Sequence, residues 1–177
     1  MAALAGCHDP LTQVVVVFQS DLDVPTETDG LGIFASEGPF APDSNAASVN
    51  SGAPLLGSHF PLSIGVDSAG ATQTFSMTVQ LFQGFASSQG TPPLIVVNRT
   101  VTDIRFVDQQ TMMLVLPLLR ACACQGTSCP SPGDPQCDNI DRPPLQPFND
   151  AVAPPSTMMP AGGINIAPHP PAGVRPQ

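Results

Sequence analysis

The chain has 177 residues, which is enough for one domain of ordinary size with a tail but not for two full domains. Its 14 acidic residues outnumber 5 basic ones, all arginine, and the net charge is -9. This balance excludes nucleic acid as a partner, because no cluster of cations is available to bind phosphates. The 22 prolines and 15 glycines interrupt helices, so short strands are expected.

Residues 1–10 contain a motif that resembles a lipoprotein processing site. Leu4-Ala5-Gly6-Cys7 is similar to the lipobox, at which bacterial signal peptides are cut before a lipid-modified cysteine. A signal peptide also needs a positive start and an apolar stretch of about 7 to 15 residues, so the rest of it would have to lie upstream of Met1. The motif predicts lipid attachment at Cys7 and then a spacer. The alternative is that Cys7 is an ordinary cysteine.

Apolar patterns predict strands along most of the chain that follows. The alternation in TFSMTVQLFQGF is the clearest strand pattern, and LTQVVVVF is so apolar that it predicts a strand buried on both faces or central to a sheet. The segment 37–57 has little periodicity and predicts a long loop. The predicted strands are 11–18, 31–35, 59–66, 74–85, 94–97 with 100–106, and 111–119.

Strands at this spacing, without helical patterns between them, predict an all-β fold. We expect an antiparallel immunoglobulin-like (Greek-key) β-sandwich of about 6 to 8 strands over residues 11–142. The absence of Trp and Tyr excludes an antibody-type domain in detail. Residues 143–177 form a Pro-rich tail, which is predicted to be largely disordered from about residue 151.

Four cysteines cluster within residues 120–138, directly after the last predicted strand. An even number of cysteines in this position predicts two disulfides that staple the carboxyl-terminal segment of an exported protein. Neighbours two apart should not pair with each other, so Cys122 and Cys124 are each expected to bond to Cys129 or Cys137. A zinc site of four thiolates is the alternative, although its usual paired C-x2-C spacing is missing.

The segments TQVVVVFQSDLDVPTETDGLGI, PLSIGV and MMLVLPLLRACACQGTSC, followed by a further cysteine and LQPF, resemble a family of uncharacterised lipoproteins from myxobacteria and their relatives. The similarity covers residues 11–148 in outline. It implies a lipid-anchored protein with this strand order and a cysteine-rich end, and it implies no activity. The Ala-Cys-Ala-Cys doublet and the long tail depart from the family pattern.

Acidic residues between the first two strands are candidates for a calcium site, because calcium takes oxygen ligands. Their spacing does not match an EF-hand, and acids that start a tight turn are the favoured interpretation. The four candidates are Asp21, Asp23, Glu27 and Asp29.

No catalytic residues, metal ligands or cofactor are predicted. Ser58 and His59 are adjacent on a strand and face opposite sides, so they do not form a nucleophile and base. Arg99 and Arg105 are predicted to face solvent.

The sequence therefore predicts an exported, lipid-anchored protein of the cell envelope, at the outer membrane or the periplasmic face. It would act as a binding or structural module, with an envelope protein or a glycan as its partner. The alternative function is a small extracytoplasmic hydrolase or metal-dependent enzyme with an unrecognised site.

Overall fold

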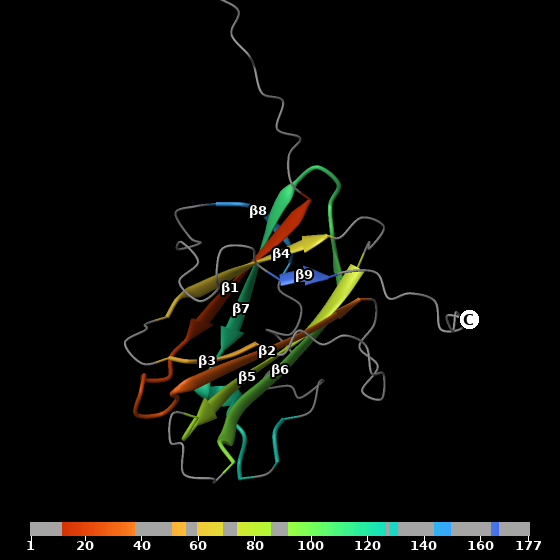
Figure 1. Ribbon diagram of the computed structural model, residues 1–177. Coiled ribbons are helices and arrows are strands. Elements are labelled where there is room, and N and C mark those ends of the chain that lie inside the picture. The colour runs from red at the N-terminus through yellow and green to blue at the C-terminus, as the bar shows by residue number, and fades with distance from the viewer. Residues whose placement is uncertain are drawn as a thin grey trace, which may run out of the picture.

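A computed structural model of the protein describes residues 12–37, 51–55, 60–68, 74–85, 92–126, 128–130, 144–149 and 164–166. The structure is built from strands and one short 3-10 helix (Figure 1). The elements are β1 (Gln13–Ser20), β2 (Gly30–Glu37), β3 (Ser51–Pro54), β4 (Leu62–Ser68), β5 (Thr74–Gln83), β6 (Leu94–Arg105), β7 (Thr111–Leu118), η1 (Arg120–Cys122), β8 (Gln146–Pro147) and β9 (Ile164–Ile166).

The strands form two sheets. Sheet A has the order β8-β7-β1-β4-β9, and sheet B has the order β3-β2-β5-β6. Figure 1 shows sheet B crossing the lower part of the view and β1, β4 and β7 of sheet A above and behind it. One hydrophobic core contains buried side chains from both sheets, which confirms the predicted all-β sandwich.

Two of the strand pairs are parallel, whereas the sequence predicts antiparallel sheets. The β1 strand pairs in parallel with β7, from Gln13 opposite Thr111 to Ser20 opposite Leu118, and β4 pairs in parallel with β9. Neither pair is joined by a hairpin, and strands connected through long intervening chain can pair in either direction. The remaining strand pairs, such as β1 with β4 and β5 with β6, are antiparallel.

The β1 strand is buried on both faces, as its sequence predicts. Val14, Val16 and Phe18 point into the main core and are fully buried. Val17 lies on the opposite face, where it packs with the buried Met113 of β7. The strand occupies the centre of sheet A, between β7 and β4.

Three short strands lie where no strand is predicted. The β3 strand falls within the expected loop 37–57 and pairs with β2, and β8 pairs with β7. The β9 strand falls within the tail that is predicted to be disordered, so that prediction is wrong for Ile164–Ile166. Short edge strands of this kind are stabilised by backbone pairing, which leaves little pattern in their side chains.

Candidate functional site

A cavity of about 410 Å³ opens between the edge strand of sheet B and the β7 side of sheet A. Pockets for small ligands in proteins have volumes of roughly 300 to 1,000 Å³. The cavity is lined by Val101, Thr102, Asp103, Ile104, Arg105, Leu114, Pro144 and Leu145. It therefore takes residues from β6, from β7 and from the segment that leads into β8.

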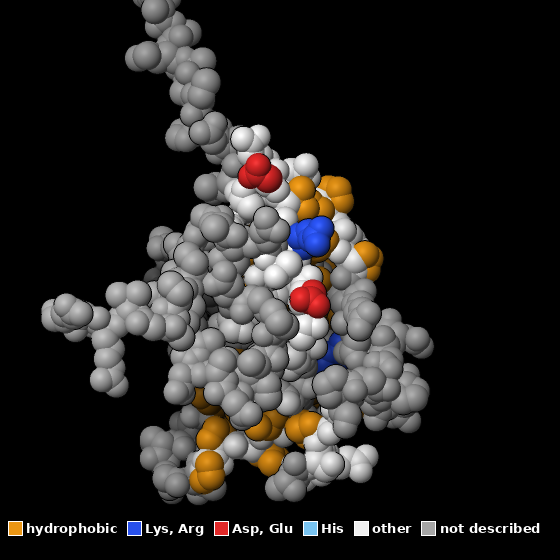
Figure 2. Space-filling view, turned by 90° about the vertical axis from the view of Figure 1, so that its right-hand side faces the viewer, with side chains coloured by type: hydrophobic (Ala, Val, Ile, Leu, Met, Phe, Trp, Pro, Cys, Tyr) orange, Lys and Arg blue, Asp and Glu red, His pale blue; other side chains and the backbone are white. Residues whose placement is uncertain are grey.

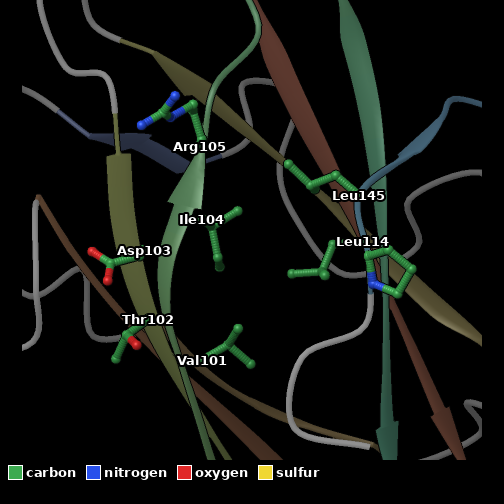
Figure 3. Close-up of a pocket in the computed structure, with 8 residues that line it drawn as sticks. Val101, Thr102, Asp103, Ile104, Arg105, Leu114 and Leu145 are labelled. Atoms are coloured by element: carbon green, nitrogen blue, oxygen red, sulfur yellow. The ribbon is translucent and has the colours of Figure 1, made fainter.

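The side chains that face one another across the cavity are apolar. Figure 3 shows Val101 and Ile104 of β6 pointing towards Leu114 and Leu145. Val101, Ile104 and Leu114 are buried, and Leu145 is half-buried at the edge of the core. Thus an apolar group that enters the cavity would leave water and contact aliphatic carbon on both sides.

The polar lining residues point away from this space. In Figure 3 the side chains of Thr102, Asp103 and Arg105 extend from the far side of β6, and all three are exposed. Among the described lining residues, therefore, the side chains that face the cavity are apolar, which suits a non-polar ligand.

A β-bulge in β6 produces this arrangement. Phe75 of β5 pairs with Ile104 and Met77 pairs with Val101, so β6 carries one residue more than β5 over this interval. Asp103 takes a left-handed conformation there, with φ of 55°. Without the extra residue, alternation from Val101 would turn Asp103 and Arg105 inwards. The bulge instead places Ile104 in the cavity.

Of the four candidate calcium ligands, Asp21, Glu27 and Asp29 accept hydrogen bonds through their carboxylates around the loop between β1 and β2, and Asp23 contributes its backbone. Asp21 Oδ1 accepts a hydrogen bond from the backbone N–H of Arg120 at 2.6 Å, and Glu27 Oε2 accepts one from the backbone N–H of Asp23 at 2.9 Å. Arg120 Nη2 also donates to Glu27 Oε2 at 2.5 Å. Asp29 Oδ1 accepts from the backbone N–H of Phe85 at 2.8 Å.

These acids do not share one common centre: Asp21 and Glu27 both accept from Arg120, whereas Asp29 accepts from Phe85. Within the described ranges, no three His, Cys, Asp or Glu side chains gather closely enough to hold a metal ion. The backbone N–H groups of Glu27 and Thr28 both donate to the carbonyl of Asp23, at 2.9 and 3.2 Å, which closes a tight turn. In the described part of the chain these acids therefore take part in turn and loop hydrogen bonds and do not gather into a group of metal ligands.

The cysteine-rich segment contains the expected disulfide. Cys124 is bonded to Cys129, and Cys122 is also disulfide-bonded. Bonded sulfurs are not thiolates, so Cys124 and Cys129 do not serve the alternative zinc site. Cys7 and Cys137, as well as Ser58 and His59, lie outside the described residues.

This segment pairs with the first half of β6. Ala123 forms an antiparallel bridge with Val97, and the backbone N–H of Cys124 donates to the carbonyl of Val96 at 2.7 Å. The backbone N–H of Gln125 and the carbonyl of Ser128 close a small turn at 2.7 Å. The disulfide thus holds a covering segment on the edge of sheet B.

Arg99 corrects a prediction, because it is buried with only 4% of its surface exposed rather than facing solvent. It shares the inward face of β6 with Val97 and Val101, and its Nη1 donates to Cys122 Sγ at 3.7 Å. Arg105 is exposed, as predicted. The prediction that Arg99 faces solvent considered only its charge. The alternation of the strand places Arg99 on the same face as Val97 and Val101, two residues away on either side.

The cavity was not predicted from the sequence. A signal was present in β6, where the buried Val101 and Ile104 are three residues apart instead of the two that a regular strand requires. That spacing indicates a bulge. The facing residues Leu114 and Leu145 come from distant parts of the chain, and no pattern in the sequence links them to β6.

No family model, curated protein or solved structure matches the chain. Among the described residues, no helix has the length and apolar character needed to cross a membrane.

Proposed function

We propose that the protein is an exported envelope lipoprotein whose sandwich binds an apolar group in the cavity between β6 and β7. The observation that carries this proposal is the cavity itself, with aliphatic side chains facing each other from the two sheets. A ligand with a short aliphatic or aromatic portion would gain about 25 cal/mol for each Å² of apolar surface that it buries there.

Export is supported by the disulfide between Cys124 and Cys129. Disulfides persist in oxidising compartments and are rare in the reducing cytosol. The Leu-Ala-Gly-Cys motif and the resemblance to myxobacterial lipoproteins support an anchor at Cys7. A lipid there would hold the domain close to its membrane.

Binding is favoured over the alternative of a hydrolase or metal-dependent enzyme. Catalytic sites place a nucleophile, base or oxyanion donor against the reacting atoms. The cavity instead presents carbon at its floor, while its carboxylate and guanidinium groups point outwards.

The cavity is tested by titrating the purified protein with the apolar fluorophore anilinonaphthalenesulfonate. Leu145→Asp places a charge at the cavity from a half-buried position, and it should weaken binding by about tenfold or more, because an apolar contact is replaced by a group that prefers water. The matched control is Thr102→Asp, which adds the same charge to a side chain that points away. Equal binding by both variants would overturn the assignment of the cavity as the site.

The anchor is tested separately in cells that express the full-length gene. A labelled fatty acid should be incorporated into the wild-type protein, and Cys7→Ala should abolish both the label and the sedimentation with membranes. The anchor would be disproved if the Cys7→Ala protein still carried the label and stayed with the membranes.

A further inference from the structure

The outward face of sheet B carries a cluster of partly exposed aromatic rings. Phe34, Phe82 and Phe85 are all half-buried: Phe82 and Phe85 lie at the end of β5, beside Gly30 at the start of β2, and Phe34 lies in the middle of β2. Hydrophobic side chains gather at the lower end of the molecule in Figure 2, where Figure 1 places the end of β5 and the start of β6. This face of sheet B points away from the hydrophobic core and from the cavity.

Two glycines allow the rings to lie against the sheet. A Cβ on Gly32 would come within 2.8 Å of Cε2 of Phe82, and a Cβ on Gly30 would collide with the side chain of Phe85. The ring of Phe34 lies beside the same position, 3.5 Å from the Cβ on Gly32. In β2, therefore, Gly-Leu-Gly presents a leucine to the core and leaves space for aromatic rings on the outer face.

The rings are also held in place. The centroids of the Phe82 and Phe85 rings are 5.8 Å apart, which is within the range of a favourable aromatic pair. Asp29 accepts a hydrogen bond from the backbone N–H of Phe85 at 2.8 Å and donates its own backbone N–H to the carbonyl of Phe82 at 2.8 Å. These hydrogen bonds fix the backbone that carries the two rings, and the contact between the rings restricts them further, so less conformational entropy is lost when a ligand binds.

Uncharged hydrogen-bonding groups continue the same face across β5 and β6. Gln80 Nε2 donates to Asn98 Oδ1 at 3.3 Å, and the hydroxyls of Thr78 and Thr100 are 2.8 Å apart. Gln80, Asn98 and Thr100 are half-buried, so these groups can be reached from solvent. Each amide has more donor and acceptor positions than this one mutual bond uses.

We propose that this aromatic-amide face, formed by Phe34, Phe82, Phe85, Gln80, Asn98 and Thr100, binds a neutral glycan. The C–H groups on the flat side of a sugar ring are attracted to the negative face of an aromatic ring. The hydroxyls of the sugar are both donors and acceptors, so they can form hydrogen bonds with amide and threonine side chains. The six side chains of the face are uncharged, so they do not select an anionic or cationic polymer.

An apolar protein surface would suit this face less well. Covering Gln80 and Asn98 with carbon would leave their remaining donors and acceptors unpaired, at a cost of about 1 to 3 kcal/mol for each unsatisfied group. A sugar satisfies these groups while it stacks on the rings. The proposal concerns a different surface from the cavity and does not depend on it.

Affinity electrophoresis in gels that contain dextran, laminarin or glucomannan tests the proposal. At least one of these neutral polysaccharides should retard the wild-type protein, and Phe82→Ala should weaken that binding by about tenfold. Phe82→Tyr keeps the ring and should retain the binding. The matched control is Phe148→Ala, which removes an aromatic side chain that is 44% exposed at the end of β8.

Asn98→Ala gives a second test that leaves the rings and the core unchanged, and it should weaken binding by about threefold. If thermal unfolding shows that Phe82→Ala does not fold, the binding of Asn98→Ala serves as the test of the proposal. The proposal is overturned if none of the three polysaccharides retards the wild-type protein, or if the folded Phe82 and Asn98 variants bind as tightly as the wild type.

Discussion

Arg99 Nη1 donates a hydrogen bond to Cys122 Sγ at 3.7 Å, and both residues are almost completely buried. The contact joins the inward face of β6 to the segment that the disulfides hold. A buried arginine contributes its apolar stem as well as its charge. The pair therefore connects the edge of sheet B to its covering segment.

Arg99→Ala should lower the free energy of unfolding by about 2 to 4 kcal/mol, because the substitution leaves a cavity where the arginine stem packs. Arg99→Met keeps most of the apolar stem, so it should lower the free energy of unfolding by less than Arg99→Ala does. Urea denaturation of the two variants measures the difference. Wild-type stability in Arg99→Ala would show that the buried side chain does not stabilise the fold.

Replacing both Cys124 and Cys129 with serine should lower the free energy of unfolding by about 2 kcal/mol, the value expected when a loop this short is no longer closed in the unfolded chain. The same comparison in the presence of a reductant is the control, and there the difference between the proteins should shrink. A difference that persisted under reduction would have to come from the serine side chains and not from the lost bond.

Asp67 gives the stability a dependence on pH. It lies opposite Gln13 in the pairing of β1 with β4, and burial raises its pKa, while a hydrogen bond with Gln13 lowers the pKa to a smaller extent. The folded state thus keeps the proton to a higher pH than the unfolded state does. Stability should fall as the pH rises from about 3.9, the ordinary pKa of aspartate, through the raised pKa.

The asparagine of Asp67→Asn cannot ionise. The variant should therefore not lose stability as the pH rises, and its Tm at neutral pH should be slightly higher than that of the wild type. Thermal unfolding from pH 3 to pH 8 compares it with the wild type. The matched control is Asp103→Asn at an exposed site, and this variant should still lose stability as the pH rises. A pH profile of Asp67→Asn that is parallel to that of the wild type would assign the effect to another group.

The bulge in β6 depends on a left-handed residue at position 103. Asp103→Val should destabilise the fold by about 1 to 2 kcal/mol, because a β-branched side chain strongly disfavours positive φ. Asp103→Gly should cause no such loss. Thermal unfolding of the two variants provides the measurement, and equal losses in both would mean that the backbone conformation is not the cause.

Local sequence pattern predicted the strands that carry a side-chain signal. The run of valines predicted β1 correctly as a strand buried on both faces. The alternation predicted β5 and its buried apolar residues, but Ser76 and Thr78 of the opposite face are buried as well. The β3 and β9 strands gave no such signal, since they are short edges stabilised by pairing with β2 and β4.

The cavity and the burial of Arg99 depend on how distant segments come together. Leu114 and Leu145 meet β6 only after the two sheets have packed, and Arg99 reaches Cys122 only when the cysteine segment lies along that strand. A pattern within one strand does not contain this information. The aromatic-amide face is similar, because the rings of Phe82 and Phe85 lie over glycines that belong to another strand.

Methyl-resolved NMR of the folded protein during titration with decanoate tests whether the cavity binds an apolar ligand. Binding there should produce saturable shifts of the methyl signals of Ile104, Leu114 and Leu145, which line the cavity, and no shift for Val17, which lies on the other face of sheet A. Unchanged cavity signals, or shifts as large at Val17 as at Ile104, would contradict the assignment of this cavity as a binding site.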